Sequence, residues 1–254
     1  MAGKQSGLGD NLYIDQYDLS GDVNSLGRIA CPVAVQDNTQ GIKKYAMERL
    51  RLLADGAIEM TSLFNVDSAA GAEGAHVALK SLPRTDRQIT YCRGTAIGSA
   101  AASMMSKQIN YDGTREASGA FTFEVNAQAN GFGLEWGNLL TAGKRTDTTA
   151  TSPATGADLG SSPTSYSFGW VAYLHLIAFT GTSVTVTLQD SANNSAFTSL
   201  TGGAFTAATG RGVQRLVSSS TTATVRRYVR AITTGTFTNA VFAVNFVRYE
   251  LSQS

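Results

Sequence analysis

The stretch FGWVAYLHLIAF, residues 168–179, is the longest apolar run of the chain. Its apolar side chains occupy both alternating sets, namely Trp170, Leu174 and Leu176 on one and Val171, Tyr173 and Ile177 on the other. Alternate residues of a strand point to opposite faces, so this pattern predicts a central strand covered on both faces. The run is too short to span a bilayer as a helix and contains His175.

Short β-branched and aromatic segments follow this run, with Gly, Ser and Asn turns between them. Residues 183–189 alternate Val184, Val186 and Leu188 with threonines, and a DSANN turn comes next. Further strands are expected at 204–208, 212–217, 224–233 and 240–249. The pattern is typical of an antiparallel β-sandwich with about eight strands.

The first half is also expected to be mainly β. Phe121, Phe123, Val125 and Ala127 alternate with Thr122, Glu124, Asn126 and Gln128, which predicts a strand in a sheet with one wet face. Further strands are predicted at 57–64, 88–93, 104–111 and 133–140, although the Met pair within 104–111 also fits the start of a helix. Residues 43–53 and 72–82 predict short helices, and Pro83 ends the second.

Charge and composition divide the chain near residue 152. Residues 1–150 carry a net charge of −2 and residues 151–254 a net charge of +3. The stretch around this boundary, residues 141–165, is rich in Thr, Ser, Ala, Gly and Pro and has no hydrophobic periodicity, which is typical of a linker. We therefore expect a domain at 1–151 with an N-terminal arm, a linker at 152–165 and a second domain at 166–254.

The sequence contains little that suits catalysis or strong nucleic-acid binding. The net charge is only +1, whereas dedicated nucleic-acid binders are strongly basic. Cys31 and Cys92 are too far apart in sequence for a metal knuckle, and we expect both to be reduced. The only histidines, His76 and His175, lie on a predicted helix and strand without a nucleophile motif. We expect no enzyme, no cofactor, no metal and no membrane insertion.

Several stretches together resemble the major tail tube protein of long-tailed bacteriophages, particularly those of actinobacteria. They are YDLSGDVNSLGRI, ADGAIEMTSLFN, AHVALKSLPRTDRQITYCRGTAIGS and KQINYDGTREASGAFTFEVNAQANGFGLEWGNLLTAGKRTDT. The downstream runs LIAFTGTSVTVTLQDSANNSAFTSLTGGAFTAATGRGVQRL and TATVRRYVRAITTGTFTNAVFAVNFVR are similar to the C-terminal domain often attached to such proteins.

This resemblance implies a structural virion protein with a mainly β fold. Its first domain would be a tail-tube β-sandwich or barrel with a flanking short helix, and its second a C-terminal antiparallel β-sandwich on the outside. Subunits would form stacked hexameric rings around the tape measure protein, between tail initiator and terminator proteins. DNA would pass through without specific binding. The protein would be assembled in the host bacterial cytoplasm and reside in the virion tail.

With this resemblance, the polar face of the 121–128 strand becomes a candidate lining for the tube lumen. Its residues are Thr122, Glu124, Asn126 and Gln128, with Glu59 of the 57–64 strand as a neighbour. A wall of acids and amides does not bind phosphates tightly, because it offers no cations and the like charge of the acids repels them. This suits a passage for DNA. Residues 1–20 and 143–165 are expected to be arms that become ordered on assembly.

Two other classes of function stay open at this stage. The first is a virion or surface adhesin whose C-terminal sandwich binds carbohydrate, with Trp170, Tyr173 and Phe197 as candidate aromatic contacts. These side chains fit a sandwich core equally well. The second is a hydrolase, for which no acid and base constellation is present.

Overall fold

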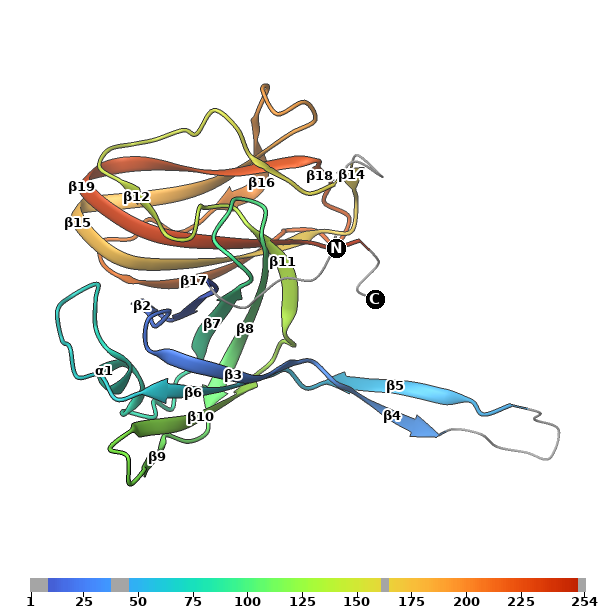
Figure 1. Cartoon of the computed structure of the whole chain (residues 1–254). Coiled ribbons are helices and arrows are strands. Elements are labelled where there is room, and N and C mark those ends of the chain that lie inside the picture. Colours follow the sequence, from blue (N-terminus) through green and yellow to red (C-terminus); the bar gives the residue numbers. More distant parts are fainter. Residues whose placement is uncertain (1–8, 38–45, 161–164, 251–254) are drawn as a thin grey trace, which may run out of the picture.

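The computed structural model describes residues 9–37, 46–160 and 165–250, and within them the chain is almost entirely β, as the sequence predicts (Figure 1). The first ten strands are β1 (Asn11–Ile14), β2 (Tyr17–Asp18), β3 (Val23–Ala30), β4 (Val33–Asp37), β5 (Arg49–Ala54), β6 (Ala57–Leu63), β7 (Arg87–Cys92), β8 (Ala100–Gln108), β9 (Asp112–Arg115) and β10 (Phe121–Ala129). The short helix α1 (Ala75–Leu79) lies between β6 and β7.

The remaining strands belong mostly to the second half of the chain. They are β11 (Glu135–Leu139), β12 (Arg145–Asp147), β13 (Ala157–Asp158), β14 (Ser165–Tyr166), β15 (Trp170–Ser191), β16 (Thr198–Ala204), β17 (Gly212–Val217), β18 (Val225–Arg226) and β19 (Tyr228–Arg248). A single path of hydrogen-bonded strands, β16-β15-β19-β11-β8-β10-β6-β3, joins the two halves. All pairings in it are antiparallel.

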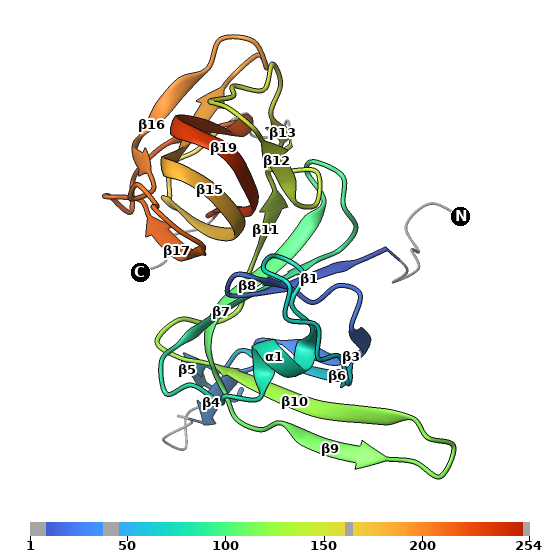
Figure 2. The same ribbon diagram turned by 90° about the vertical axis from the view of Figure 1, so that its left-hand side faces the viewer.

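Two long strands, β15 and β19, form the centre of the second half. They pair along nearly their whole length and curl together, while β17 and β16 pair with opposite ends of β15 (Figure 2). Bulges near Gly181 let the pair bend without ending. A Cβ on Gly235 would lie 2.3 Å from the Ser183 carbonyl oxygen, so this bend requires glycine.

The expectation of about eight strands in this half is therefore wrong in detail. The segments predicted at 168–179 and 183–189 are parts of β15, and most of those at 224–233 and 240–249 are parts of β19. The segment expected at 204–208 is wrong apart from its first residue, because β16 spans Thr198–Ala204. Gly181, which lies between two of the predicted segments, is at a bulge within β15 rather than in a turn.

The double-sided apolar pattern of residues 168–179 is confirmed, and the two faces of β15 contact different cores. Trp170, Leu174 and Leu176 belong to the large cluster inside the C-terminal sandwich. On the opposite face, Ile177 packs with Tyr13, Cys92, Ala101 and Leu139 of the first half. One face of β15 thus closes its own sandwich, and the other binds the first half.

Buried polar groups connect the same two halves. His175 is fully buried, with Nδ1 2.7 Å from the Asp15 carbonyl oxygen and Nε2 2.7 Å from Thr90 Oγ1. Thr90 in turn lies 2.7 Å from Ser103 Oγ, which accepts a bond from Asn245 Nδ2. Because buried polar groups are costly without partners, this chain of bonds specifies how the halves meet.

A carboxylate adds a second polar connection at β11. Glu135 accepts hydrogen bonds from the hydroxyls of Tyr173 and Tyr249, and Arg215 lies 3.3 Å from its carboxylate. Burial, together with the nearby Glu135 charge, raises the pKa of the Tyr173 hydroxyl well above its usual value. The hydroxyl therefore stays protonated as a donor, and β11 is bonded to strands of the second half.

Two predictions for the first half differ from the structure. The helix expected at 43–53 is wrong where the structure describes it, because Arg49–Ala54 forms β5 and pairs with β4. Residues 38–45 lie outside the described part. The helix expected at 72–82 exists as the shorter α1, and the Met pair lies in β8 rather than in a helix.

The predicted arms and linker also carry strands. Leu12, Tyr13 and Ile14 of β1 are buried, so the arm expected at 1–20 is wrong for its described residues, whereas 1–8 lie outside them. In the segment 143–165, β12 and β13 pair with β19, although 161–164 are not described. Strand pairing therefore crosses the proposed boundary, and the domain division stays a prediction.

We predict that Gly137→Ala destabilises the junction between the halves. A Cβ at this position of β11 would lie 2.3 Å from the Phe246 carbonyl oxygen, and backbone cannot yield as a flexible side chain does. Overpacking of this kind costs about 1–3 kcal/mol, measurable by urea denaturation. Gly27→Ala is the matched control, because its Cβ would meet nothing closer than 3.9 Å. Equal stability of the two variants would contradict this account.

We also predict that acid weakens the fold through His175. Burial lowers the pKa of its imidazole from 6.5 to about 4. The unfolded chain binds a proton near pH 6.5 and the folded chain only near pH 4, so stability is full above this window and falls with pH through it. The loss is about 3 kcal/mol.

Urea denaturation between pH 7.5 and 4.5 measures this effect against His175→Gln, which does not titrate. The variant is expected to be less stable at pH 7.5 but to show a flatter dependence on pH. Parallel pH profiles for the two proteins would contradict the assignment.

Candidate assembly surface

Four strands of the first half form a sheet whose two outer edges are free of partners among the described residues. Its order is β3-β6-β10-β9, and β9 continues from β8 along the same side of β10. Within the described part of the chain, β3 pairs only with β6, and β9 pairs only with β10. An eight-residue edge and a four-residue edge thus lie on opposite sides of one sheet.

The alternation predicted for residues 121–128 is confirmed within β10. Phe123, Val125 and Ala127 are buried, and Val125 and Ala127 join the core of the first half. On the other face, Glu124 and Gln128 are exposed, and Thr122 and Asn126 are half-buried. Phe121 departs from the pattern, because it is 36% exposed at the end of the strand.

The candidate lumen residues lie together on this polar face. Asn126 is opposite Glu59 in the ladder between β10 and β6, and its Nδ2 donates to Glu124 Oε1 at 3.4 Å. Glu124 is also opposite Asp112 of β9. The structure brings the predicted residues onto one surface of the chain, whereas their facing a lumen stays a prediction.

Two charged residues on this surface escaped the sequence analysis. Arg28 Nη1 lies 3.4 Å from Glu59 Oε1, so the Glu59 charge is partly balanced. A bulge between Leu26 and Arg28 breaks the alternation of β3, so no periodic signal placed Arg28 here. Asp112 lies on β9, a polar strand without an apolar pattern. Only strand pairing reveals these two positions.

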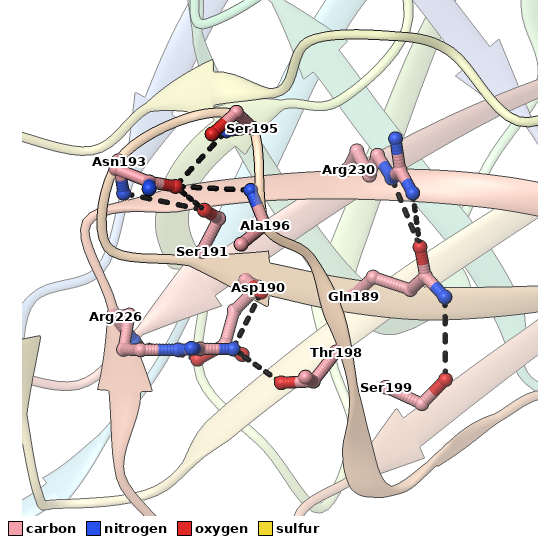
Figure 3. A network of polar contacts seen from close by, with 10 residues as sticks. All are labelled: Gln189, Asp190, Ser191, Asn193, Ser195, Ala196, Thr198, Ser199, Arg226 and Arg230. Atoms are coloured by element: carbon pink, nitrogen blue, oxygen red, sulfur yellow. Dashed lines mark hydrogen bonds and ion pairs between the residues drawn. The ribbon is translucent and has the colours of Figure 1, made fainter.

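Arg226, Arg227 and Arg230 lie close together in the sequence, and each is paired with a side chain of the same chain, which does not favour binding of a phosphate. Arg226 Nη2 lies 2.5 Å from Asp190 Oδ1, and Arg230 Nε donates to Gln189 Oε1 at 2.9 Å. Figure 3 shows both contacts. Arg227 pairs with Asp158. The DSANN turn is confirmed beside them, because Asn193 Oδ1 accepts bonds from the backbone of Ser195 and Ala196 (Figure 3).

Two of the three aromatic residues considered for a sugar site cannot present a stacking face. Trp170 and Tyr173 are fully buried in the core. Phe197 is half-buried, and the Arg230 guanidinium lies 4.0 Å from the centre of its ring. Trp170 and Tyr173 are therefore wrong as carbohydrate contacts, whereas Phe197 stays a prediction.

Further observations concern other kinds of site. Among the described residues, no three His, Cys, Asp or Glu side chains gather in a way that could hold a metal ion. No helix in that part of the chain is long and apolar enough to cross a membrane. Cys31 and Cys92 are unpaired, and burial raises the pKa of the Cys92 thiol to about 12.

No protein-family model matches the chain, and curated proteins give no significant match. Among solved structures, the chain is similar to the SPP1 Dit (gp 19.1) protein, described as a paradigm of the hub adsorption apparatus in phages infecting Gram-positive bacteria. That alignment has a TM-score of 0.35 and 12% identity and covers 94% of this chain and 99% of the other.

A chain of the phage p2 baseplate in its activated conformation with Sr gives a TM-score of 0.35 and 10% identity, with 95% and 99% of the chains covered. The corresponding baseplate structure with Ca gives 0.33 and 11%, with the same coverage. Because these TM-scores are low, we transfer no residue role from these proteins to this chain.

Proposed function

We propose that this chain is a structural protein of a bacteriophage tail and that it assembles with copies of itself into closed rings. The observation that carries the proposal is the sheet β3-β6-β10-β9, whose opposite edges are both unpaired among the described residues. Free edges expose backbone donors and acceptors and favour pairing with another strand. When β3 of one copy meets β9 of the next, each copy still has one edge free, so the contact repeats until rotation closes a ring.

The bulges of β3 make this pairing selective. They lie between Val23 and Ser25 and between Leu26 and Arg28. A bulged strand twists and disrupts a regular ladder, which discourages indiscriminate strand addition. A partner strand must fit this irregular edge, as β6 does on the other side. Such selectivity suits an ordered ring rather than an aggregate.

In the finer form of the proposal, the chain is the tail tube subunit that its sequence resembles. Six copies form each ring, rings stack around the tape measure protein, and initiator and terminator proteins bound the tube. The exposed polar face with Glu124 and Gln128 then lines the lumen, and DNA passes along it. The protein acts in the virion tail as a conduit for the genome and catalyses no reaction.

The ring contact is tested by crosslinking between copies. In a chain with Ser25→Cys on β3, Thr114→Cys on β9 and Cys31→Ser, oxidation is expected to link neighbouring copies. A contact between unlike edges gives a ladder of covalent oligomers that ends at the ring number on a non-reducing gel.

Each chain with only one of the two introduced cysteines is the control and is expected to give no ladder beyond a dimer, because the remaining Cys92 is buried. If light scattering shows that the chain assembles but the double variant gives no ladder, the β3–β9 contact is excluded. Efficient dimers from Ser25→Cys alone would indicate a symmetric contact of β3 with itself. A protein that stays monomeric at all concentrations, even with initiator proteins, would contradict ring formation.

The lumen assignment predicts that Glu124→Lys slows genome ejection without preventing assembly. Glu124 is exposed, so its replacement leaves the core intact. A lysine repeated around every ring would bind phosphates, with the strongest effect at low salt, where screening is weakest. Ejection is measured as DNA release against ionic strength, with Glu124→Gln as the control without the added positive charge. Unchanged ejection at low salt would overturn the assignment.

A further inference from the structure

A groove lies at the junction of the two halves, where Glu135 of β11 meets Arg215 of β17. It encloses about 420 Å³, which is within the range of roughly 300–1,000 Å³ that is typical of small-molecule sites. Both halves contribute to its walls: Phe132 comes from the loop before β11, whereas Phe168 and Thr221 belong to the second half. The groove therefore exists only because the halves are joined.

Two aromatic side chains of this groove are exposed. Phe132 is 50% exposed and Phe168 is 36% exposed, although both rings are large and apolar. Single apolar side chains on a surface are common, but aromatic rings that line one groove mark a place where a ligand packs. The groove thus offers apolar contact area that no described part of the chain covers.

The guanidinium of Arg215 is held in one position beside these rings. Its side chain is only 12% exposed, Nε donates to the Tyr173 hydroxyl at 3.1 Å, and Nη2 donates to Glu135 Oε2 at 3.3 Å. The guanidinium carbon lies 3.7 Å from the centre of the Phe132 ring. The remaining nitrogen, Nη1, has no hydrogen-bond partner among the described residues, yet it is not sealed from solvent. Arg215 is therefore a fixed donor with one position free for a ligand.

The groove has a second free polar group and no net charge. The side chain of Thr221 is exposed, and its hydroxyl has no partner among the described residues. A hydroxyl both donates and accepts hydrogen bonds. Among the described residues that line the groove, the charged side chains are Arg215 and Glu135, which balance each other. An anion therefore meets no uncompensated cation here.

A neutral sugar ring suits these features. The C–H groups of a hexopyranose form apolar faces, whose slightly positive hydrogens pack on the negative face of an aromatic ring. Its hydroxyls lie around the rim, where each can donate and accept a hydrogen bond. An aliphatic side chain in the groove would leave Arg215 Nη1 and the Thr221 hydroxyl without partners. The combination of rings, free polar groups and balanced charge thus favours a neutral sugar.

We propose that this groove binds one neutral hexopyranose unit of a glycan. The sugar ring packs against Phe132 and Phe168, and its hydroxyls bond to Arg215 Nη1 and Thr221 Oγ1. The site differs from the aromatic contacts considered from the sequence, because it lies at the junction of the halves. None of its residues lies on β3 or β9, so binding does not depend on the ring contact. Repeated in an assembly, such sites bind a polysaccharide multivalently.

Saturation-transfer difference NMR on the full chain tests the site. The probes are the methyl glycosides of glucose, galactose, mannose and N-acetylglucosamine at millimolar concentration. At least one of them is expected to bind, and Phe132→Ala or Phe168→Ala is expected to weaken that binding about tenfold, because the ring loses its packing surface. Thr221→Val keeps the shape of the side chain but removes the hydroxyl, and it is expected to weaken binding about fivefold.

Phe121→Ala is the matched control for the two phenylalanine variants. Phe121 is 36% exposed, as Phe168 is, but it lies on β10 and does not line the groove. This variant is expected to bind the sugar as tightly as the unchanged chain. Circular dichroism confirms that each variant remains folded, so a loss of binding reports on the groove rather than on unfolding.

Three results would overturn the inference. The first is that none of the four glycosides binds, and the second is binding that is unchanged in Phe132→Ala and Phe168→Ala. The third is tighter binding of methyl glucuronide than of methyl glucoside, with a difference that grows at low salt, because this would indicate an anion site. The proposed function is judged separately: a chain that stays monomeric yet binds these sugars through the groove contradicts ring formation and leaves this inference standing.

Discussion

The pairing of β15 with β19 is the interaction on which the rest of the structure depends. One face of this pair closes the C-terminal sandwich, and the other binds β1, β7 and β8 of the first half. Because β19 also pairs with β11, and β11 pairs with β8, the ladder of backbone hydrogen bonds passes from one half into the other. The sheet that carries the candidate assembly surface is therefore held on a rigid base.

The buried polar bonds at this junction make the arrangement specific. Apolar packing alone tolerates sliding of one sheet on another, but His175, Thr90 and Ser103 have partners only in one register. Gln88 adds a bond from its amide to the Leu174 carbonyl oxygen across the same junction. The two halves consequently behave as a unit, and the free edges of β3 and β9 keep fixed directions in space. A ring closes only when successive contacts repeat the same rotation, so this rigidity favours defined assembly.

Much of the fold follows from local alternation. The strand at 121–128 and the double-sided pattern at 168–179 were predictable because side chains of a strand alternate with a period of two, whatever the strand pairs with. The same rule placed Thr122, Glu124, Asn126 and Gln128 on one face. It did not separate strand from helix at 43–53, because Leu50 and Leu53 fit a helical spacing while Leu50 and Leu52 fit a strand.

The sequence by itself determined which residues form strands over most of the chain and which side chains face a core, because both depend on neighbours one or two positions away. Only the tertiary structure decided that two pairs of predicted strands run on as β15 and β19, since each bend is stabilised by the other strand. It alone also decided that Arg28 lies beside Glu59, that β4 and β5 form a separate two-stranded sheet, and that β3 and β9 are edges among the described residues. Strand partners are chosen by backbone hydrogen bonds between distant segments, and backbone groups are the same in every residue except proline, so no local pattern of side chains records the choice.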